Sequence, residues 1–215
     1  MRFDAVARRL AALPDVLPPA AAALMPEIHD ADGRRPPDLA EPAASARSAA
    51  VLVLLHPDAA GEAKVVLIER ATYDGHHSGE VSFPGGKAEP GDLDPVATAL
   101  REAAEEVGLV PDDAGLSVLG SLEPFWIPVS DFRVTPILAI APRPPTLVAR
   151  PEEVVAILQP PVERFLPDAR VDVVERTIGS WSLRYGHYDV DGRSVWGATA
   201  RVLSQLGAIL AAPLR

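Results

Sequence analysis

The segment from residue 83 to residue 109 constrains the possible folds of this chain more than any other part of it. A strand candidate ends there in the double glycine Gly85-Gly86, a tight turn at which backbone can approach a ligand or a metal ion closely. An acidic loop follows and leads straight into a helix predicted over residues 95–107. Asp94 is a good N-cap residue, and Pro95 suits the first turn of the helix. Gly108 and Pro111 mark its C-terminal end.

Three carboxylates gather on one face of the predicted helix. At about 100° per residue, Glu102, Glu105 and Glu106 fall within about 100° of arc. Three acids so close repel one another unless a cation lies among them, and oxygen ligands at this spacing suit Mg²⁺ or Mn²⁺. The alternative interpretation is a solvated acidic face on which Arg101 is a surface charge. The stripe expected to be buried lies on the opposite side and consists of Ala97, Leu100, Ala104 and Val107.

The string GGKAEPGDLDPVATALREAAEEVGL resembles the Nudix box. The pattern of that family is Gly, five residues, Glu, seven residues, and then Arg-Glu-apolar-x-Glu-Glu-x-Gly-apolar. Asp92 stands at the position of the first glutamate, and eight residues rather than seven separate it from Arg101. Ala103 fills the apolar position, and the matching residues are Arg101, Glu102, Glu105, Glu106, Gly108 and Leu109. On these residues the chain is identified as a member of the Nudix family.

Residues outside the box resemble the coenzyme A pyrophosphatase branch of the family. The loop of that branch carries the same expansion by one residue, and a matching string runs from Arg70 through residues 73–86. Gly75 stands where many members have an arginine, so one phosphate contact is either missing or supplied by another residue. Two later segments also look like that branch, residues 130–136 and 195–201.

The resemblance implies a metal-dependent enzyme that cleaves a diphosphate linked to a nucleoside into two phosphorylated products. Clustered Mg²⁺ or Mn²⁺ ions meet the need of such a reaction for charge neutralisation and a polarised water. The implied metal ligands are Glu102, Glu105, Glu106 and the carbonyl oxygen of Gly86. Arg101 is implied to brace the carboxylates, which makes Glu102, Arg101 and Glu105 the catalytic candidates.

Two roles stay open between neighbouring acids. The partner that orients Arg101 is either Asp92 or Glu89, because the extra loop residue shifts the spacing of the box. The general base is either Glu102 or an acid from a loop. The candidates for such a loop acid are Glu152 and Glu153.

Four residues are candidates for substrate binding, namely Arg70, His77, Gly85 and Lys87. Arg70 ends a strand candidate and either binds the anionic substrate or forms a surface ion pair with Glu69 or an aspartate. His77 either contacts phosphate or is a solvated loop residue. Three aromatic residues are interpreted as core rather than base-stacking groups: Trp181, Tyr185 and Trp196.

The order of the predicted elements indicates an α/β fold. Strands, a helix, more strands and a second helix over residues 197–211 follow one another. This order suits a Nudix-like α/β/α sandwich with a mixed β-sheet and a helix on each face. The strand candidates span residues 49–56, 64–70, 81–83, 116–122, 133–141, 153–158, 181–185 and 193–196.

The chain is predicted to divide into an N-terminal arm, residues 1–45, and a Nudix hydrolase domain, residues 46–215. Residues 2–13 carry apolar side chains at helical spacing and predict a short amphipathic helix. Residues 14–45 are rich in Pro, Ala and Asp and predict an extended segment with little structure of its own. The family resemblance begins only after this arm, at about residue 47.

Charge and composition argue against several classes of partner. The net charge is −10, from 20 Lys and Arg against 30 Asp and Glu, which does not suit sequence-independent nucleic-acid binding. Cysteine is absent, which excludes disulfides, thiolate metal sites and cysteine nucleophiles. No apolar run approaches the ~20 residues of a membrane span, and charges interrupt any signal-peptide pattern, so we expect no membrane partner and a cytoplasmic location.

Three functions compete at this stage. The first is metal-dependent hydrolysis of the diphosphate of coenzyme A or its thioesters, giving adenosine 3′,5′-bisphosphate and 4′-phosphopantetheine or its acyl form. The second keeps this chemistry but acts on another small nucleoside diphosphate derivative, such as ADP-ribose, NADH or a damaged nucleotide. The third is a catalytically silent Nudix module that binds a nucleotide, against which the intact set of three acids argues.

Overall fold

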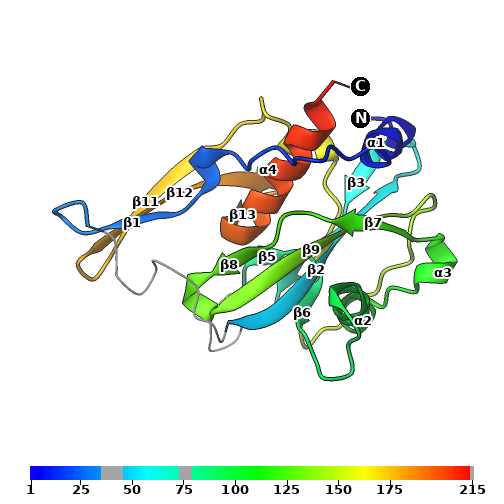
Figure 1. Cartoon of the computed structure of the whole chain (residues 1–215), viewed down its shortest axis with the longest axis horizontal. Coiled ribbons are helices and arrows are strands. Elements are labelled where there is room, and N and C mark those ends of the chain that lie inside the picture. Colours follow the sequence, from blue (N-terminus) through cyan, green and yellow to red (C-terminus); the bar gives the residue numbers. More distant parts are fainter. Residues whose placement is uncertain (35–45, 73–78, 214–215) are drawn as a thin grey trace.

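The computed structural model describes residues 1–34, 46–72 and 79–213. Figure 1 shows a central sheet between two long helices, with a second group of strands extending to one side. The substrate-binding candidate His77 and the departure from the family pattern at Gly75 both lie outside the described residues.

A six-stranded mixed sheet forms the centre of the fold. β2 (Arg47–Pro57) and β9 (Phe132–Ile140) run parallel to each other, with Leu55 opposite Ile140. The other four strands pair antiparallel with one of these two. They are β3 (Ala63–Val65), β6 (Gly85–Lys87), β7 (Ser117–Ser121) and β8 (Phe125–Ile127). The predicted mixed sheet of an α/β fold is therefore confirmed.

Alternate residues of β2 face two different hydrophobic cores. Leu54 lies in the core to which α2 (Pro95–Val107) contributes, whereas Leu55 lies in the core to which α4 (Gly197–Ala211) contributes. Because successive side chains of a strand point to opposite faces, a strand covered on both faces is apolar along its whole length. The two helices cover opposite faces of the sheet, as predicted (Figure 1).

Two smaller antiparallel sheets extend this centre. One consists of β10 (Val154–Leu158), β4 (Leu67–Arg70) and β5 (Val81–Ser82), with β4 in the middle. The other consists of β1 (Glu27–His29), β11 (Asp172–Ile178), β12 (Trp181–Val190) and β13 (Arg193–Trp196). β13 also packs beside β5, which brings the two smaller sheets together.

The residues predicted as one strand over 64–70 form two strands. β3 pairs with β2 in the central sheet, whereas β4 pairs with β10 and β5. Val66 separates them, and its backbone N–H still donates to the carbonyl oxygen of Leu54. The apolar run continues through this change of partner, so the pattern of the sequence does not mark it.

The sequence does not predict β1, β8 or β11. Most side chains of β11 are exposed, so no apolar alternation marks this strand. β1 pairs with β12, and the short 3-10 turn η1 (Ala22–Leu24) precedes it. The expectation that residues 14–45 have little structure of their own is therefore wrong for these two elements, which gain their order from contacts with distant strands.

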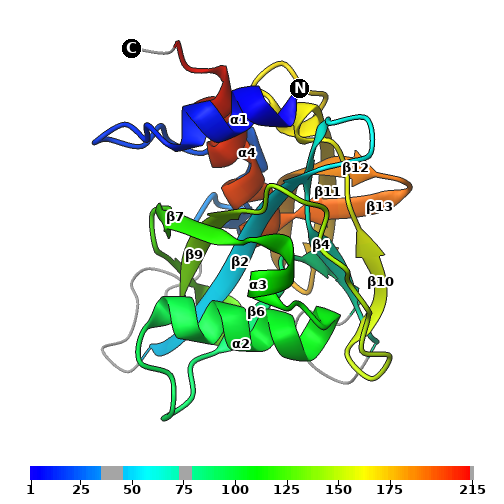
Figure 2. The ribbon, with the colours of Figure 1, turned by 90° about the vertical axis from the view of Figure 1, so that its right-hand side faces the viewer.

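The predicted N-terminal helix is present as α1 (Phe3–Leu10). Phe3, Val6 and Leu10 are buried in the same core as α4, and Figure 2 shows the two helices packed together. The remaining short helices are α3 (Pro111–Ala114), η3 (Pro128–Ser130) and η4 (Val162–Phe165). Among the described residues, no helix is long and apolar enough to cross a bilayer. The domain division at residue 46 stays a prediction.

Candidate active site

α2 begins and ends where the sequence predicts. The side chain of Asp94 accepts a hydrogen bond from the backbone N–H of Ala97 at 2.8 Å, and Pro95 occupies the first turn. Gly108 ends the helix with a φ of 62°. These caps satisfy backbone groups that helix ends otherwise leave unpaired. The helix packs along β6 and β2, as Figure 2 shows.

Part of the acidic face of α2 is turned toward the protein rather than toward solvent. Glu106 is 1% exposed, whereas Ala104, which was expected in the buried stripe, is exposed. The predicted stripe is therefore only partly right, since Val107 is buried and Leu100 packs partly buried against the same core. The residues that are buried on α2 are Thr98, Ala99, Ala103, Glu106 and Val107. The physical reason is the neighbouring strand β6, which has no side chain at its first two positions.

The double glycine of β6 makes room for the carboxylates. A Cβ atom at Gly86 would lie 2.6 Å from Oε1 of Glu102, so no larger residue fits without moving that carboxylate. A Cβ atom at Gly85 would lie 2.4 Å from the carbonyl oxygen of Ala50 on β2. Gly85 also has a φ of 151°, which residues with a side chain rarely adopt. The tight turn predicted here is thus a strand, and its two glycines let the backbone of β6 lie directly against the acids of the helix.

Glu106 is a buried carboxylate held by two donors. The backbone N–H of Gly85 donates to its Oε2 at 2.8 Å, and Nη1 of Arg70 donates to its Oε1 at 3.2 Å. Burial is the strongest influence and raises the pKa of Glu106 to about 7, although both donors favour the ionised form. The negative charges of Glu102 and Glu153 act in the same direction as burial. A cation bound next to this carboxylate would therefore favour its ionised form.

Arg101 ties the acidic loop to the acids of the helix. Its Nε and Nη2 each donate to one carboxylate oxygen of Asp92 at 3.1 Å, and Nη2 also donates to the carbonyl oxygen of Lys87 at 3.0 Å. The same guanidinium contacts Glu102 at 3.1 Å and Glu105 at 3.2 Å. A planar fork of five donors suits so many oxygens at fixed angles. The partner of Arg101 that the sequence left open is Asp92.

Asp92 is fixed by further donors from the loop and the helix. The backbone N–H of Glu89 and the hydroxyl of Thr98 each donate to it at 2.9 Å. The hydrogen bond from Arg101 is the largest of the influences that hold the pKa of Asp92 well below its usual range. The sequence pattern did not single out Thr98. A hydroxyl in the first turn of the helix, one turn after the N-cap Asp94, is the signal that could have identified it.

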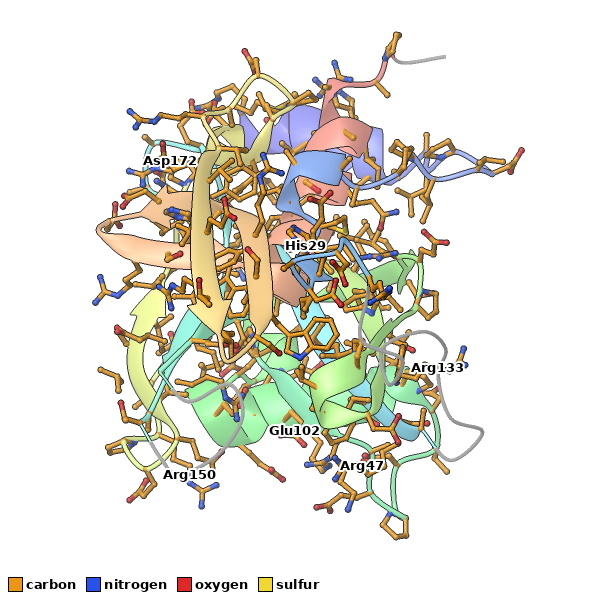
Figure 3. All side chains as sticks on the ribbon, turned by 90° about the vertical axis from the view of Figure 1, so that its left-hand side faces the viewer. His29, Arg47, Glu102, Arg133, Arg150 and Asp172 are labelled. Atoms are coloured by element: carbon orange, nitrogen blue, oxygen red, sulfur yellow. The ribbon has the colours of Figure 1, made fainter. Side chains whose placement is uncertain are left out.

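The three acids of α2 lie at different depths. The side chain of Glu102 is 15% exposed, and burial raises its pKa, whereas the side chain of Glu105 is 45% exposed. Figure 3 shows Glu102 on the helix, on the side of the molecule from which Arg150 and Arg47 are also visible. Exposure of the acids therefore falls from Glu105 through Glu102 to the buried Glu106.

Comparison with known proteins agrees with this geometry. A family model described as the NUDIX domain matches residues 46–176, which is more than half of the chain. The chain belongs to the Nudix family. The protein named Nudix hydrolase 15, mitochondrial, of Arabidopsis thaliana is 37% identical over 169 residues, a match that covers 76% of this chain but only 58% of that protein.

Other Nudix proteins resemble the chain over more of their length or in their fold. The uncharacterized Nudix hydrolase NudL of Enterobacter sp. (strain 638) is 34% identical over 176 residues, covering 79% of this chain and 86% of that protein. The crystal structure of the Nudix hydrolase RenU from M. smegmatis is 24% identical, with a TM-score of 0.47, over 64% of this chain and 80% of that one. The predicted Nudix family is confirmed, and the coenzyme A branch stays a prediction.

The oxygen atoms on α2 and at Gly86 are of the type that binds a divalent metal ion. Three carboxylates and the carbonyl oxygen of Gly86 are the hard oxygen ligands that Mg²⁺ and Mn²⁺ prefer. As the side chains lie, no three of the described His, Asp and Glu residues converge on one point. Glu102 and Glu105 form ion pairs with Arg101, and Glu106 forms one with Arg70. The residues fit the ion by the chemistry of their oxygens and by their burial.

One of the two loop acids lies close to the Nudix helix. The charge of Glu153 raises the pKa of both Glu102 and Glu106 by like-charge repulsion. Glu152 is exposed and has an ion-pair contact of 3.9 Å with Arg150. Arg150 also lies 3.5 Å from Glu153. If a loop supplies the general base, the position of Glu153 favours it over Glu152.

Arg70 and Gly85, two of the predicted substrate-binding residues, reach the site. Both contact the carboxylate of Glu106. The surface pair considered between Arg70 and Glu69 does not form, because Glu69 instead pairs with Arg193 at 2.8 Å. Strand alternation explains this division, since neighbouring side chains of β4 point to opposite faces.

The side chain of Lys87, another predicted substrate contact, is not brought to the acids. Gly86 faces α2, so strand alternation turns the exposed side chain of Lys87 to the opposite face of β6. His77 lies outside the described residues. Among the aromatic residues, Tyr185 is buried and packs against Trp196 with ring centroids 4.6 Å apart, which favours the core interpretation of this pair.

Proposed function

We propose that this Nudix protein is a metal-dependent pyrophosphohydrolase that cleaves the diphosphate of a small nucleoside diphosphate derivative. The observation that carries the proposal is the guanidinium of Arg101, which joins Asp92 to Glu102 and Glu105 beside the buried Glu106. A solvated acidic helix face would need neither the burial of Glu106 nor the double glycine beside it. Membership of the Nudix family supports the same activity.

In this proposal the acids of α2 hold Mg²⁺ or Mn²⁺. Glu102, Glu105, Glu106 and the carbonyl oxygen of Gly86 are the proposed ligands. When bound, the ion neutralises charge on the diphosphate and polarises a water molecule. Arg101 keeps the carboxylates oriented through its contacts with Asp92. It therefore acts on the reaction through the ligands rather than by touching the substrate.

The proposed proton acceptor is a carboxylate at the edge of this group. There are two candidates. One is Glu102, which is partly buried, and the other is Glu153, whose negative charge acts on both Glu102 and Glu106. Burial raises the pKa of Glu102, which makes this carboxylate a better base near neutral pH. Glu105 is more exposed and pairs with Arg101, so its proposed role is that of a ligand on the solvent side.

Within this class we propose the diphosphate of coenzyme A or its thioesters as the substrate. Support comes from the resemblance of residues 79–86, 130–136 and 195–201 to that branch, and from the expanded loop before α2. Cleavage would give adenosine 3′,5′-bisphosphate and 4′-phosphopantetheine or its acyl form. The resemblance includes Arg70, whose side chain remains 25% exposed while it holds Glu106.

Product analysis tests both levels of the proposal. The full chain is incubated with Mg²⁺ or Mn²⁺ and, separately, with coenzyme A, acetyl-coenzyme A, dephospho-coenzyme A, ADP-ribose and NADH, and the products are identified by mass spectrometry. We expect adenosine 3′,5′-bisphosphate from coenzyme A and no product when a chelator is present. A matched Glu102→Gln variant controls for contaminating hydrolases.

The possible outcomes distinguish the proposed reaction from the proposed substrate. Faster turnover of ADP-ribose or NADH than of coenzyme A would reject the coenzyme A proposal and keep the pyrophosphohydrolase. Tight nucleotide binding without turnover of any compound would instead favour the catalytically silent module. Activity that persists in the Glu102→Gln variant would show that the measured hydrolysis does not come from this site.

A further inference from the structure

Two buried polar atoms on the neighbouring strands β4 and β5 have no hydrogen-bond partner among the described residues. They are Nε of Arg70 and Oγ of Ser82, and neither has a partner among the described residues. Buried polar atoms in folded proteins are almost always paired, because an unpaired one has lost its water without replacement. Two such atoms at one place therefore call for a ligand that supplies the missing contacts.

The two atoms belong to the same face of neighbouring strands. Ser82 on β5 is directly opposite Ile68 on β4, and Arg70 follows Ile68 by two residues on the same strand. Side chains opposite each other on antiparallel strands, and side chains two apart on one strand, point to the same face. Ile68 packs in the core that α2 completes, so Ser82 and Arg70 also face α2.

The guanidinium of Arg70 is already fixed in place on this face. Its Nη1 donates to Oε1 of Glu106 at 3.2 Å, which holds the guanidinium beside the most buried of the three acids. Its Nε–H is left as a buried donor without a partner among the described residues, although the side chain as a whole is 25% exposed. Ser82 adds a hydroxyl that is able to donate or accept.

We propose that Ser82 Oγ and Arg70 Nε form a subsite for one phosphoryl oxygen of the diphosphate substrate. The inference rests on the proposed pyrophosphohydrolase function and extends it to Ser82, a residue not yet placed in the site. The Nε–H of an arginine only donates, so the ligand atom must be an acceptor. An anionic phosphoryl oxygen forms short, strong hydrogen bonds with a guanidinium and a hydroxyl. The subsite lies next to Glu106, where the bound cation is proposed.

The test measures binding rather than turnover. Affinity of the full chain for methylene-bridged ADP, which cannot be hydrolysed at the bridge, is determined by calorimetry with Mg²⁺ for the wild type and for Ser82→Ala. We expect Ser82→Ala to weaken binding by about tenfold or more, as for a lost hydrogen bond to a charged oxygen. The melting temperature without ligand should stay equal or rise, because the substitution removes an unpaired buried hydroxyl.

A second hydroxyl beside β5 provides the matched control. The buried hydroxyl of Thr199 donates to the carbonyl oxygen of Val81 at 3.0 Å. Thr199→Val removes this bond at nearly constant volume. We expect this variant to lower the melting temperature and to leave the affinity for methylene-bridged ADP unchanged, which is the opposite pattern from Ser82→Ala.

Three results would overturn the subsite. Unchanged affinity in Ser82→Ala is the first, and it would also be the result if the hydroxyl holds only a structural water. A melting temperature that falls while affinity is kept is the second. The third is an equal loss of affinity for Mg²⁺ alone, titrated without nucleotide, which would place the hydroxyl at the metal.

Failure of the subsite and failure of the proposed function give different results. If the wild type hydrolyses a compound of the substrate panel but Ser82→Ala binds the analogue normally, only the subsite is rejected. If the wild type hydrolyses nothing but binds the analogue through Ser82, the subsite stands and the hydrolase proposal is rejected.

Discussion

Nη1 of Arg70 lies 3.2 Å from Oε1 of Glu106, across 36 positions of sequence, and joins the end of β4 to the buried face of α2. The contact joins to the acids an arginine that the sequence predicts as a substrate-binding residue. It also leaves Glu106 with only partial compensation of its charge. Burial outweighs Arg70 and the Gly85 N–H together, so the pKa of Glu106 rises to about 7.

The first prediction concerns the pH dependence of the metal-free protein. The pKa of Glu106 is about 7 in the folded chain against an ordinary value of 4.5. Between these values the folded state binds more protons than the unfolded state, so this group's contribution to the free energy of unfolding falls as pH rises. The loss begins near pH 4.5, is complete above pH 7 and is on the order of 3 kcal/mol.

Comparison with Glu106→Gln isolates this contribution. Urea unfolding of both proteins is measured with a chelator at several pH values from 4 to 8.5, and the difference in the free energy of unfolding is plotted. We expect the wild type to lose stability relative to the variant through the range of about pH 4.5–7. A difference that does not change with pH would mean that Glu106 titrates alike in the folded and unfolded states.

The second prediction concerns the double glycine. Gly86→Ala places a Cβ atom where Oε1 of Glu102 lies, so that carboxylate has to move. Displacement of a ligand by about 1 Å is enough to lower turnover by about 100-fold. Gly91→Ala is the matched control, because a Cβ atom there meets nothing within 4 Å. Turnover and circular dichroism are measured for both; equal activity of the two variants would contradict the role of Gly86.

The third prediction concerns the bracing role of Arg101. Arg101→Ala should lower kcat strongly, and Arg101→Lys should recover it only in part, because an ammonium group cannot reproduce the planar contacts with Asp92 and Glu102. Asp92→Asn should have a smaller effect in the same direction. Steady-state kinetics at saturating Mg²⁺ provide the measurement. Full activity of Arg101→Lys would reduce the role of Arg101 to simple charge balance.

The fourth prediction compares the two neighbouring loop acids. Glu153→Gln should lower kcat by about 100-fold if Glu153 accepts the proton, whereas Glu152→Gln should stay within about twofold of the wild type. Glu153→Gln should also lower the pKa of Glu106, since it removes a nearby negative charge. The pH profile of kcat/KM follows both effects. Equal kinetics for the two variants would leave Glu102 as the proton acceptor.

Local sequence determines the parts of this site that lie within a few turns of one another. Asp94, Pro95 and Gly108 set the ends of α2, because caps act through the backbone beside them. Helical periodicity alone places Glu102, Glu105 and Glu106 on one arc. The family pattern is read from these same residues, so it too follows from the sequence without the fold.

Tertiary structure alone decides which way that arc points and what meets it. Periodicity gives the angle between side chains but not the direction of the core, so the burial of Glu106 and the exposure of Ala104 follow only from the packing of β6 and its glycines against α2. The contact of Arg70 with Glu106 and the pairing of Ser82 with Ile68 depend on strands far apart in the sequence. Such contacts arise only when the sheets close around the helix, and burial then sets the charge state of Glu106.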